Sequence, residues 1–181
     1  MAKTLIFLII IAALLVIMWY IATSNELKRA VVKVEEALSD IDVALIKRYD
    51  VLVKMLDISK SYAKYEKETI LETIHLRSNM SMADRNNAAK EMNQADIFLN
   101  AVAENYPELK SSENFKQLQL SVMNCEEHLQ AARRVYNSNI SYLNQKIVSF
   151  PSSVVANRMQ LNSKEFIEIE AYKKQDVKME F

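Results

Sequence analysis

The sequence contains no glycine, only two prolines and a single cysteine among its 181 residues. An average chain of this length carries about 13 glycines. Without glycine there is no Walker phosphate loop, no dinucleotide-binding Gly-x-Gly-x-x-Gly turn and no Gly-x-Ser-x-Gly nucleophile elbow. The Asn-Gly and Asp-Gly turns typical of β-hairpins are absent for the same reason. These absences exclude several large enzyme classes and predict a mostly helical chain.

The charge balance argues against one class of partner, and the lone cysteine leaves the cellular compartment open. The chain has 23 basic and 23 acidic side chains, so its formal net charge is zero. Nucleic-acid binding depends on clustered Lys and Arg, and the composition therefore gives no reason to expect a nucleic-acid partner. One cysteine forms no internal disulfide, so cysteine content favours neither an oxidising nor a reducing compartment.

The N-terminal segment is an uninterrupted apolar run of 18 residues, Leu5–Ala22. As a helix it would be about 27 Å long, close to the hydrocarbon thickness of a bilayer. Trp19 and Tyr20 lie near its end, beside Ile21, where aromatic rings favour the headgroup layer. We therefore predict a transmembrane anchor over residues 1–24. A cleaved signal peptide is the alternative, although its apolar region is usually only about 7–15 residues long.

The basic residues around this run indicate its orientation. Lys3 is the only side-chain cation before the run, whereas Lys28, Arg29 and Lys33 follow it closely. Because cytoplasmic flanks are enriched in Lys and Arg, we expect a single-pass protein of the cell membrane with its N-terminus outside. The remainder of the chain would then be cytoplasmic.

The residues after the anchor carry a heptad pattern. Apolar side chains alternate in steps of four and three at Leu27, Val31, Val34, Leu38, Ile41 and Leu45. This spacing is typical of a helix that lays one seam against a partner. Arg48, Ser59 and Glu66 interrupt the continuation of the seam, while a second stripe follows at Tyr49, Leu56, Ala63 and Ile70. With neither Gly nor Pro before Arg77, the pattern predicts one helix from Asn25 to about Arg77, first coiled coil and then bundle.

Three further helices are predicted. The second covers roughly Ala83–Tyr106 and ends because Pro107 pushes the preceding residue out of the α region. The third shows apolar side chains at intervals of seven: Phe115, Val122, Leu129, Tyr136, Leu143 and Phe150. These six are the predicted bundle core. A fourth segment begins at Ser152 or Ser153 and runs to about Ala171, with Val155, Met159 and Phe166 on one side, before a charged tail at 172–181. The prediction is an all-α, up-and-down bundle of three to four helices over residues 25–171, with coiled-coil character and the anchor continuous with its first helix.

Candidate chemistry is sparse. Di-metal sites in helical bundles need two Glu-x-x-His pairs, and the chain has one, Glu72 and His75. Cys125 and His128 could join them around zinc, but Cys125 also fits the apolar pattern, where a cysteine is usually a small buried hydrophobe. No Ser/His/Asp grouping falls on a known motif. We therefore predict no catalytic residue, no metal ligand and no cofactor.

Three clusters of residues resemble the LemA family of bacterial membrane-anchored helical proteins. They are Ile41–Asp50 with Ser61–Glu68, then Glu104–Lys110 with Asn114 and Phe115, then Ala132–Asn137 with Tyr142, Asn144 and Phe150–Ala156. Val53-Lys54 stand where the family often has Pro-Asn, and Ser61 and Tyr65 where it commonly has Gly and His. Some relatives resemble factors that shape intracellular membranes, so the resemblance implies membrane organisation rather than enzymatic activity.

The predicted lengths suggest how such a protein would act. The second helix is too short to return along the whole first helix, which would leave the seam Leu27–Leu45 bare within one subunit. Six such side chains, each contributing about 1.5–3 kcal/mol when buried, would be covered by other copies. We therefore expect a non-enzymatic scaffold whose partners are the lipid bilayer, copies of itself and other membrane proteins. An adaptor or regulatory subunit of a membrane protease or sensor is the alternative, followed by a metal-binding bundle enzyme. Coverage of the seam by the chain's own C-terminal segment would remove the reason for self-association.

Overall fold

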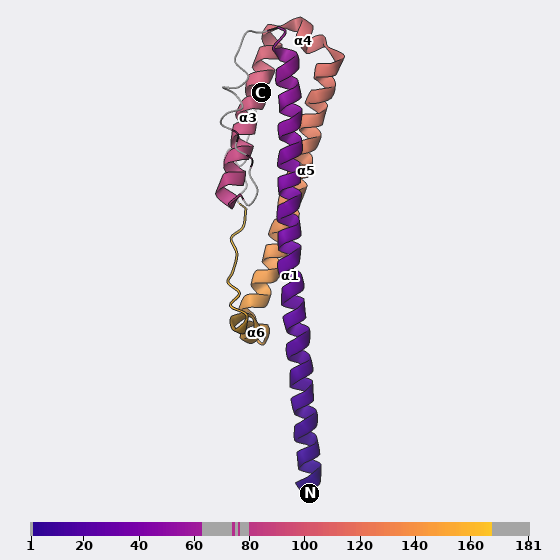
Figure 1. Ribbon diagram of the computed structural model, residues 1–181, viewed down its shortest axis with the longest axis vertical. Coiled ribbons are helices and arrows are strands. Elements are labelled where there is room, and N and C mark those ends of the chain that lie inside the picture. Colours follow the sequence, from indigo (N-terminus) through magenta and orange to yellow (C-terminus); the bar gives the residue numbers. More distant parts are fainter. Residues whose placement is uncertain (1, 63–73, 75, 77–79, 168–181) are drawn as a thin grey trace, which may run out of the picture. The chain divides into compact units, whose positions relative to one another are not determined.

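The computed structural model describes residues 2–62, 74, 76 and 80–167, and every regular element in these residues is an α-helix (Figure 1). The helices are α1 (Ala2–Ser59), α3 (Met82–Asn105), α4 (Pro107–Ser111), α5 (Glu113–Val148) and α6 (Ser152–Arg158). The predicted all-α class is confirmed, as is the single helix that contains both the apolar run and the start of the bundle.

Helix α1 ends at Ser59, well before the predicted Arg77, so that boundary is wrong. The Ser59 hydroxyl donates to the carbonyl of Met55 at 2.8 Å, a local bond that competes with the helical ladder. The next amides of Ser61 and Tyr62 bond to carbonyls only three residues back, which tightens and closes the helix. The later stripe positions Ala63 and Ile70 lie outside the described residues.

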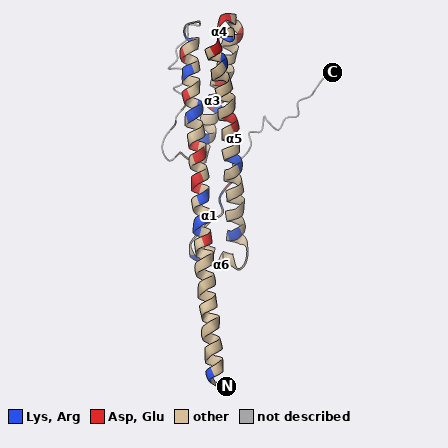
Figure 2. Ribbon diagram, turned by 90° about the vertical axis from the view of Figure 1, so that its right-hand side faces the viewer, with Lys and Arg blue, Asp and Glu red and all other residues tan. Residues whose placement is uncertain are grey.

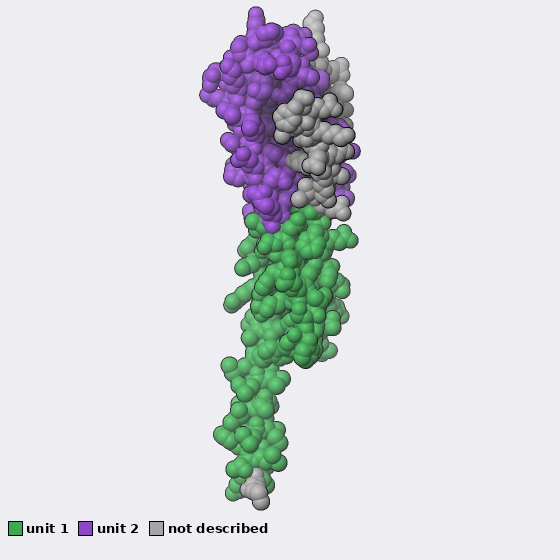
Figure 3. Space-filling model, turned by 180° about the vertical axis from the view of Figure 1, so that it is seen from behind, with its two compact units in different colours: residues 1–36, 135–181 green, residues 37–134 purple. Residues whose placement is uncertain are grey.

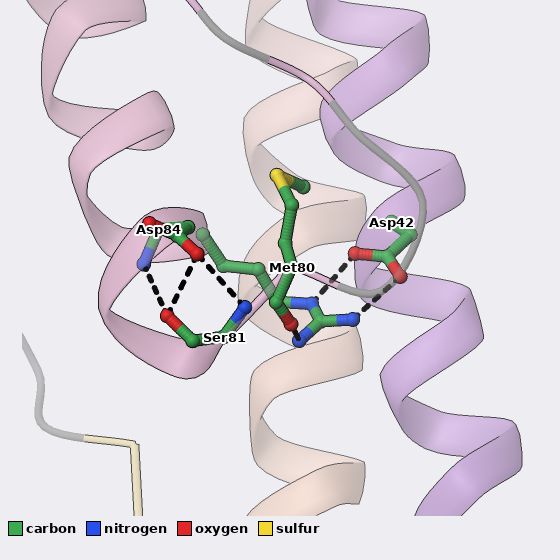
Figure 4. Close-up of polar contacts among 5 residues, drawn as sticks. Asp42, Met80, Ser81 and Asp84 are labelled. Atoms are coloured by element: carbon green, nitrogen blue, oxygen red, sulfur yellow. Dashed lines mark hydrogen bonds and ion pairs between the residues drawn. The ribbon is translucent and has the colours of Figure 1, made fainter.

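Helix α3 starts from a capping box, drawn in Figure 4. The backbone N–H of Asp84 donates to the Ser81 hydroxyl at 3.2 Å, and the Ser81 N–H donates to the Asp84 carboxylate at 3.0 Å. Two otherwise unpaired donors are thereby satisfied, which fixes where the helix begins. Its far end is set by Pro107, which opens α4 at the position that tolerates proline best. The observed span differs from the predicted Ala83–Tyr106 by one residue at each end.

Helix α6 is much shorter than predicted, because it closes in a Schellman motif at Gln160. The amide of Leu161 donates to Ala156 O and that of Gln160 to Asn157 O, both at 3.1 Å. Gln160 has φ of 56°, in the left-handed region where glycine is usual. Residues 161–167 continue without helix, so the predicted segment is not helical over these residues, and residues 168–171 lie outside the described part of the chain.

The chain forms two compact units, coloured separately in Figure 3. Unit 1 comprises residues 1–36 and 135–181, and unit 2 comprises residues 37–134. Within unit 1 the buried side chains come from α1, α5, α6 and the segment after it: Leu27, Ala30, Val34, Tyr136, Ile140, Leu143, Ile147, Val155, Ala156 and Ile167. Within unit 2, α1, α3, α4 and α5 enclose a core whose largest fully buried members are Ile41, Leu45, Leu52, Met55, Leu56, Met92, Leu99, Leu109, Phe115 and Leu129.

Candidate functional site

The apolar run at the start of α1 is exposed along its whole length in the structure. Every side chain from Ala2 to Ala22 is exposed, and the helix is long and apolar enough to cross a membrane. Trp19 and Tyr20, at 38 % and 40 %, are among its less exposed side chains. Figure 2 shows no charged residue along α1 between its N-terminal turn and the start of the bundle. Exposure of so many apolar side chains in water would be strongly unfavourable, which is the pattern expected of a lipid-facing helix.

The seam Leu27–Leu45 is buried within the folded chain, which contradicts the expectation that it would be exposed in a single subunit. Leu27, Val34, Ile41 and Leu45 are between 0 % and 2 % exposed, and Val31 and Leu38 are partly buried. In unit 1 the residues of α5 lie alongside α1 and cover it, as the bond of 2.9 Å from Asn139 Nδ2 to the carbonyl of Lys33 shows. The prediction weighed the second helix and the C-terminal segment as covers, whereas the long third helix (α5) returns past the same stretch. This seam therefore is not a surface for self-association.

Five of the six predicted core residues of α5 are buried. Phe115, Val122 and Leu129 lie in the core of unit 2, and Tyr136 and Leu143 in that of unit 1, all at 5 % exposure or less. The prediction that Phe150 belongs to the core is wrong, because this side chain is 84 % exposed. Helix α5 ends at Val148, so the seven-residue rhythm no longer applies two residues later. Ile140 and Ile147, which the prediction omitted, are buried one helical turn after Tyr136 and Leu143.

A buried arginine joins the three long helices of unit 2. Arg48 of α1 is 3 % exposed; its Nη1 donates to Glu126 of α5 at 2.9 Å and its Nη2 to Asn93 of α3 at 2.7 Å. Gln130 holds the other oxygen of Glu126 at 2.7 Å. Burial raises the pKa of the nearby Asp96, and the positive charge of Arg48 opposes that rise. A charge at an apolar seam position was the sequence signal for this cluster.

A second buried arginine binds α3 to α1 and is drawn in Figure 4. Arg85, 8 % exposed, makes a two-pronged pair with Asp42, Nε to Oδ1 at 2.6 Å and Nη2 to Oδ2 at 2.7 Å, and Nη1 also donates to the carbonyl of Met80. Such forked pairs fix orientation as well as adding energy. Sequence reasoning missed this pair, because Arg85 stands among polar residues at the start of α3 and only the folded bundle brings it to Asp42.

In unit 1 a polar triad lies where α5 passes the first charged turn of the bundle. Glu26 of α1 accepts from Lys146 Nζ at 2.8 Å and from the hydroxyl of Tyr142. These bonds, that from Lys146 first, hold the pKa of Glu26 below its ordinary value. The hydrogen bond to Glu26 in turn raises the pKa of both Tyr142 and Lys146.

The residues considered for metal binding do not form a cluster where the structure describes them. Cys125 is buried and His128, on the same helix, is exposed, so the two point to different environments. Burial raises the pKa of the Cys125 thiol, which disfavours the thiolate that metals bind. Glu72 and His75 lie outside the described residues. Among the described residues, no group of three or more His, Cys, Asp and Glu side chains could hold a metal ion.

Comparison with known proteins identifies the family. Residues 37–181 match the LemA family. Over 147 residues the chain is 31 % identical to Protein LemA of Metamycoplasma hominis, a match that covers 78 % of this chain and 67 % of that protein. The matched region contains all three residue clusters that resemble the family, together with both buried arginines. The chain therefore belongs to the LemA family.

Proposed function

We propose that this protein is a non-enzymatic, membrane-anchored scaffold that self-associates at the bilayer surface and serves membrane organisation. One observation carries the anchoring: the exposed apolar run and the buried seam of the bundle belong to one uninterrupted helix, α1. A helix that spans the bilayer with its first turns holds the residues that follow it at the membrane surface.

Substituting charge into the run tests the anchor. Leu8→Lys together with Leu15→Lys places two ammonium groups in the span, each costing about 2.5–3.5 kcal/mol at the bilayer centre. We expect the wild-type chain to resist alkaline extraction from membranes and this variant to be released. Val32→Lys with Val43→Lys, two exposed positions beyond the run, is the matched control. Equal extraction of wild type and span variant would contradict the anchor.

With the seam of α1 buried, self-association requires another surface, and unit 2 offers one on α3 and α5. Ile97, Leu120 and Met123 are large apolar side chains that are 69 %, 59 % and 61 % exposed. Leu120 and Met123 line a hollow of about 480 Å³, which Asp96 and Lys116 also line. We call this surface the α3–α5 face. Because it carries one acidic and one basic side chain, two copies related by a two-fold axis could pair acid with base while covering the apolar groups.

The oligomeric state tests self-association. We expect the detergent-solubilised wild-type protein to have a mass of two or more copies by light scattering, and Leu120→Lys with Met123→Lys to be monomeric. Val43→Lys with Ile46→Lys, exposed at 57 % and 50 % on α1, should keep the wild-type mass. A monomeric wild type would refute self-association, and an unchanged mass in the face variant would refute this surface.

A further inference from the structure

The turn between α5 and α6 carries apolar side chains that nothing within the described residues covers. Val148, Phe150 and Val154 are 69 %, 84 % and 57 % exposed, and Phe150 is the most exposed of the large apolar side chains in the described chain. We call these three residues the α5–α6 corner. Single exposed apolar side chains are ordinary, but three within seven residues at one turn form a patch.

The corner lies beside the end of the apolar run, within unit 1. Trp19 of α1 and Phe150 line the same hollow of about 340 Å³, together with Thr23, Glu26 and Lys146. The Ser24 hydroxyl also lies 3.6 Å from the sulfur of Met159, just beyond α6. Trp19 is the aromatic residue that marks the end of the span. The corner is therefore level with the place where α1 leaves the bilayer.

The charge pattern of the corner also suits a membrane surface. Residues 147–157 contain no Asp, Glu, Lys or Arg, whereas Lys146 and Arg158 flank them on either side. In Figure 2 the stretch of α1 between its N-terminal turn and the bundle is tan, and the charged residues of α1 begin where it meets the bundle. An uncharged apolar segment that ends in a long cationic side chain can enter the interface while the guanidinium group of Arg158 reaches the phosphates; Lys146 stays paired with Glu26.

From these observations we propose that the α5–α6 corner inserts into the lipid interface as a second, shallow membrane contact beside the transmembrane helix. The occupant of this surface is the bilayer at the level of the headgroups and upper acyl chains, where interfacial apolar groups are buried by about 5–10 Å. Two contacts orient unit 1 on the membrane, whereas a single helix leaves it free to rotate and tilt. The proposal rests on the membrane anchoring proposed above.

Tryptophan fluorescence of the full chain in phosphatidylcholine vesicles tests the proposal. The chain has one tryptophan, so Trp19→Phe combined with Phe150→Trp moves the only indole to the corner. Phe150 is largely exposed, so an indole at this position leaves the packing around it unchanged, and the Trp19→Phe change is common to both variants. Trp19→Phe with Val135→Trp is the matched control: Val135 is 50 % exposed on the same helix, about 20 Å from its corner end. We refer to these two proteins as the corner variant and the control variant.

We expect lipids brominated in the upper acyl chain to quench the indole of the corner variant several-fold more than that of the control variant. The emission of the corner variant should also be shifted to the blue. Aqueous iodide should quench the two variants in the reverse order.

The wild-type chain, with its indole at Trp19, reports the anchor independently. If brominated lipid quenches the wild type while the corner variant behaves like the control variant, the corner proposal is wrong and the anchor stands. If the wild type is not quenched, both fail. If the corner variant is shielded from iodide but is not quenched by bromine, protein covers the corner and the lipid proposal is wrong.

Discussion

At the scale of single residues, two arginines account for the polar order of unit 2. Arg48 and Arg85 are almost fully buried, and each reaches a carboxylate on another helix. Removing the partner of a buried charge costs much more than the intact pair contributes, because the remaining charge stays desolvated. Their main effect is therefore to penalise any packing in which the helices are misaligned.

The Arg85–Asp42 pair gives the first prediction. Asp42→Ala removes the forked carboxylate partner of the buried Arg85, and should lower the free energy of unfolding by roughly 2–3 kcal/mol. Glu104→Ala breaks the exposed pair with Lys110, in which the Lys110 side chain is 56 % and the Glu104 side chain 68 % exposed. This change should lower the free energy of unfolding by less than about 0.5 kcal/mol. Denaturant unfolding of the detergent-solubilised chain measures both. Equal losses in the two variants would contradict the importance of burial.

The triad of Glu26, Tyr142 and Lys146 gives a prediction for pH. The folded-state pKa of Glu26 is lowered, so its stabilising contribution is present above the ordinary glutamate pKa of about 4.3 and is lost as the pH falls through the lower folded value. The pKa values of Tyr142 and Lys146 are raised, so their contributions are complete below about pH 10 and are lost as the pH rises further.

We therefore expect a plateau of stability between these limits, with losses of less than about 1 kcal/mol on each side, because the groups are partly exposed. Glu26→Gln should reduce the dependence at both ends. Unfolding curves collected across the pH range would show it, and a Glu26→Gln variant with the wild-type profile would rule out the triad as the cause.

At the scale of elements, the ends of helices decide what the sequence could predict. Helix α3 was predicted within one position at each end, and its C-terminal end was predictable because Pro107 is a local signal. Helices α1 and α6 end earlier than predicted. At the end of α1 the amides of Ser61 and Tyr62 bond only three residues back, and α6 ends at a left-handed glutamine, a residue type that does not normally stop a helix. Likewise, the heptad rhythm placed Leu143 correctly and Phe150 wrongly, since periodicity carries no information about where the helix stops.

The left-handed Gln160 gives a prediction at this scale. A residue with a Cβ costs about 1–2 kcal/mol in this conformation. Glycine avoids this cost, but the larger conformational entropy of its unfolded state offsets part of the gain. Gln160→Gly should therefore raise the free energy of unfolding by roughly 0.5–1 kcal/mol, measured by denaturant unfolding. Gln160→Ala, which keeps a Cβ, should not stabilise the chain. Destabilisation by glycine would mean that the Gln160 side chain contributes an interaction of its own.

At the scale of the whole molecule, the composition predicted a helical chain and the N-terminal apolar run predicted a membrane anchor. The sequence did not show which helix packs against the apolar stripe of which other helix. A one-dimensional pattern identifies an apolar stripe but does not name its partner. Residues 135–148 pack against the start of the bundle only because α5 is long enough to extend back along α1 to that stretch. That pairing, and with it the fate of the seam Leu27–Leu45, could be read only from the fold.

Deletion of residues 2–18 tests how independent the bundle is of the anchor. All these side chains are exposed, so neither unit's core uses them. We expect the shortened chain to keep its helix content over the remaining residues and to melt within about 2 °C of the full chain in the same detergent, which corresponds to less than about 1 kcal/mol. Loss of the cooperative melting transition would show that the bundle depends on the apolar run.

The pairing of the first helix with a distant one has a consequence for synthesis. The ribosome completes α1 early, but residues 135–167, which shelter Leu27 and Val34 in unit 1, emerge about 100 residues later. At roughly 5–20 residues per second, the apolar side chains of Leu27 and Val34 remain uncovered in the nascent chain for about 5–20 s. Throughout that interval its leading segment is already available for insertion into lipid. Capture of the growing polypeptide by a chaperone during this delay would therefore be most valuable at the stretch next to the anchor.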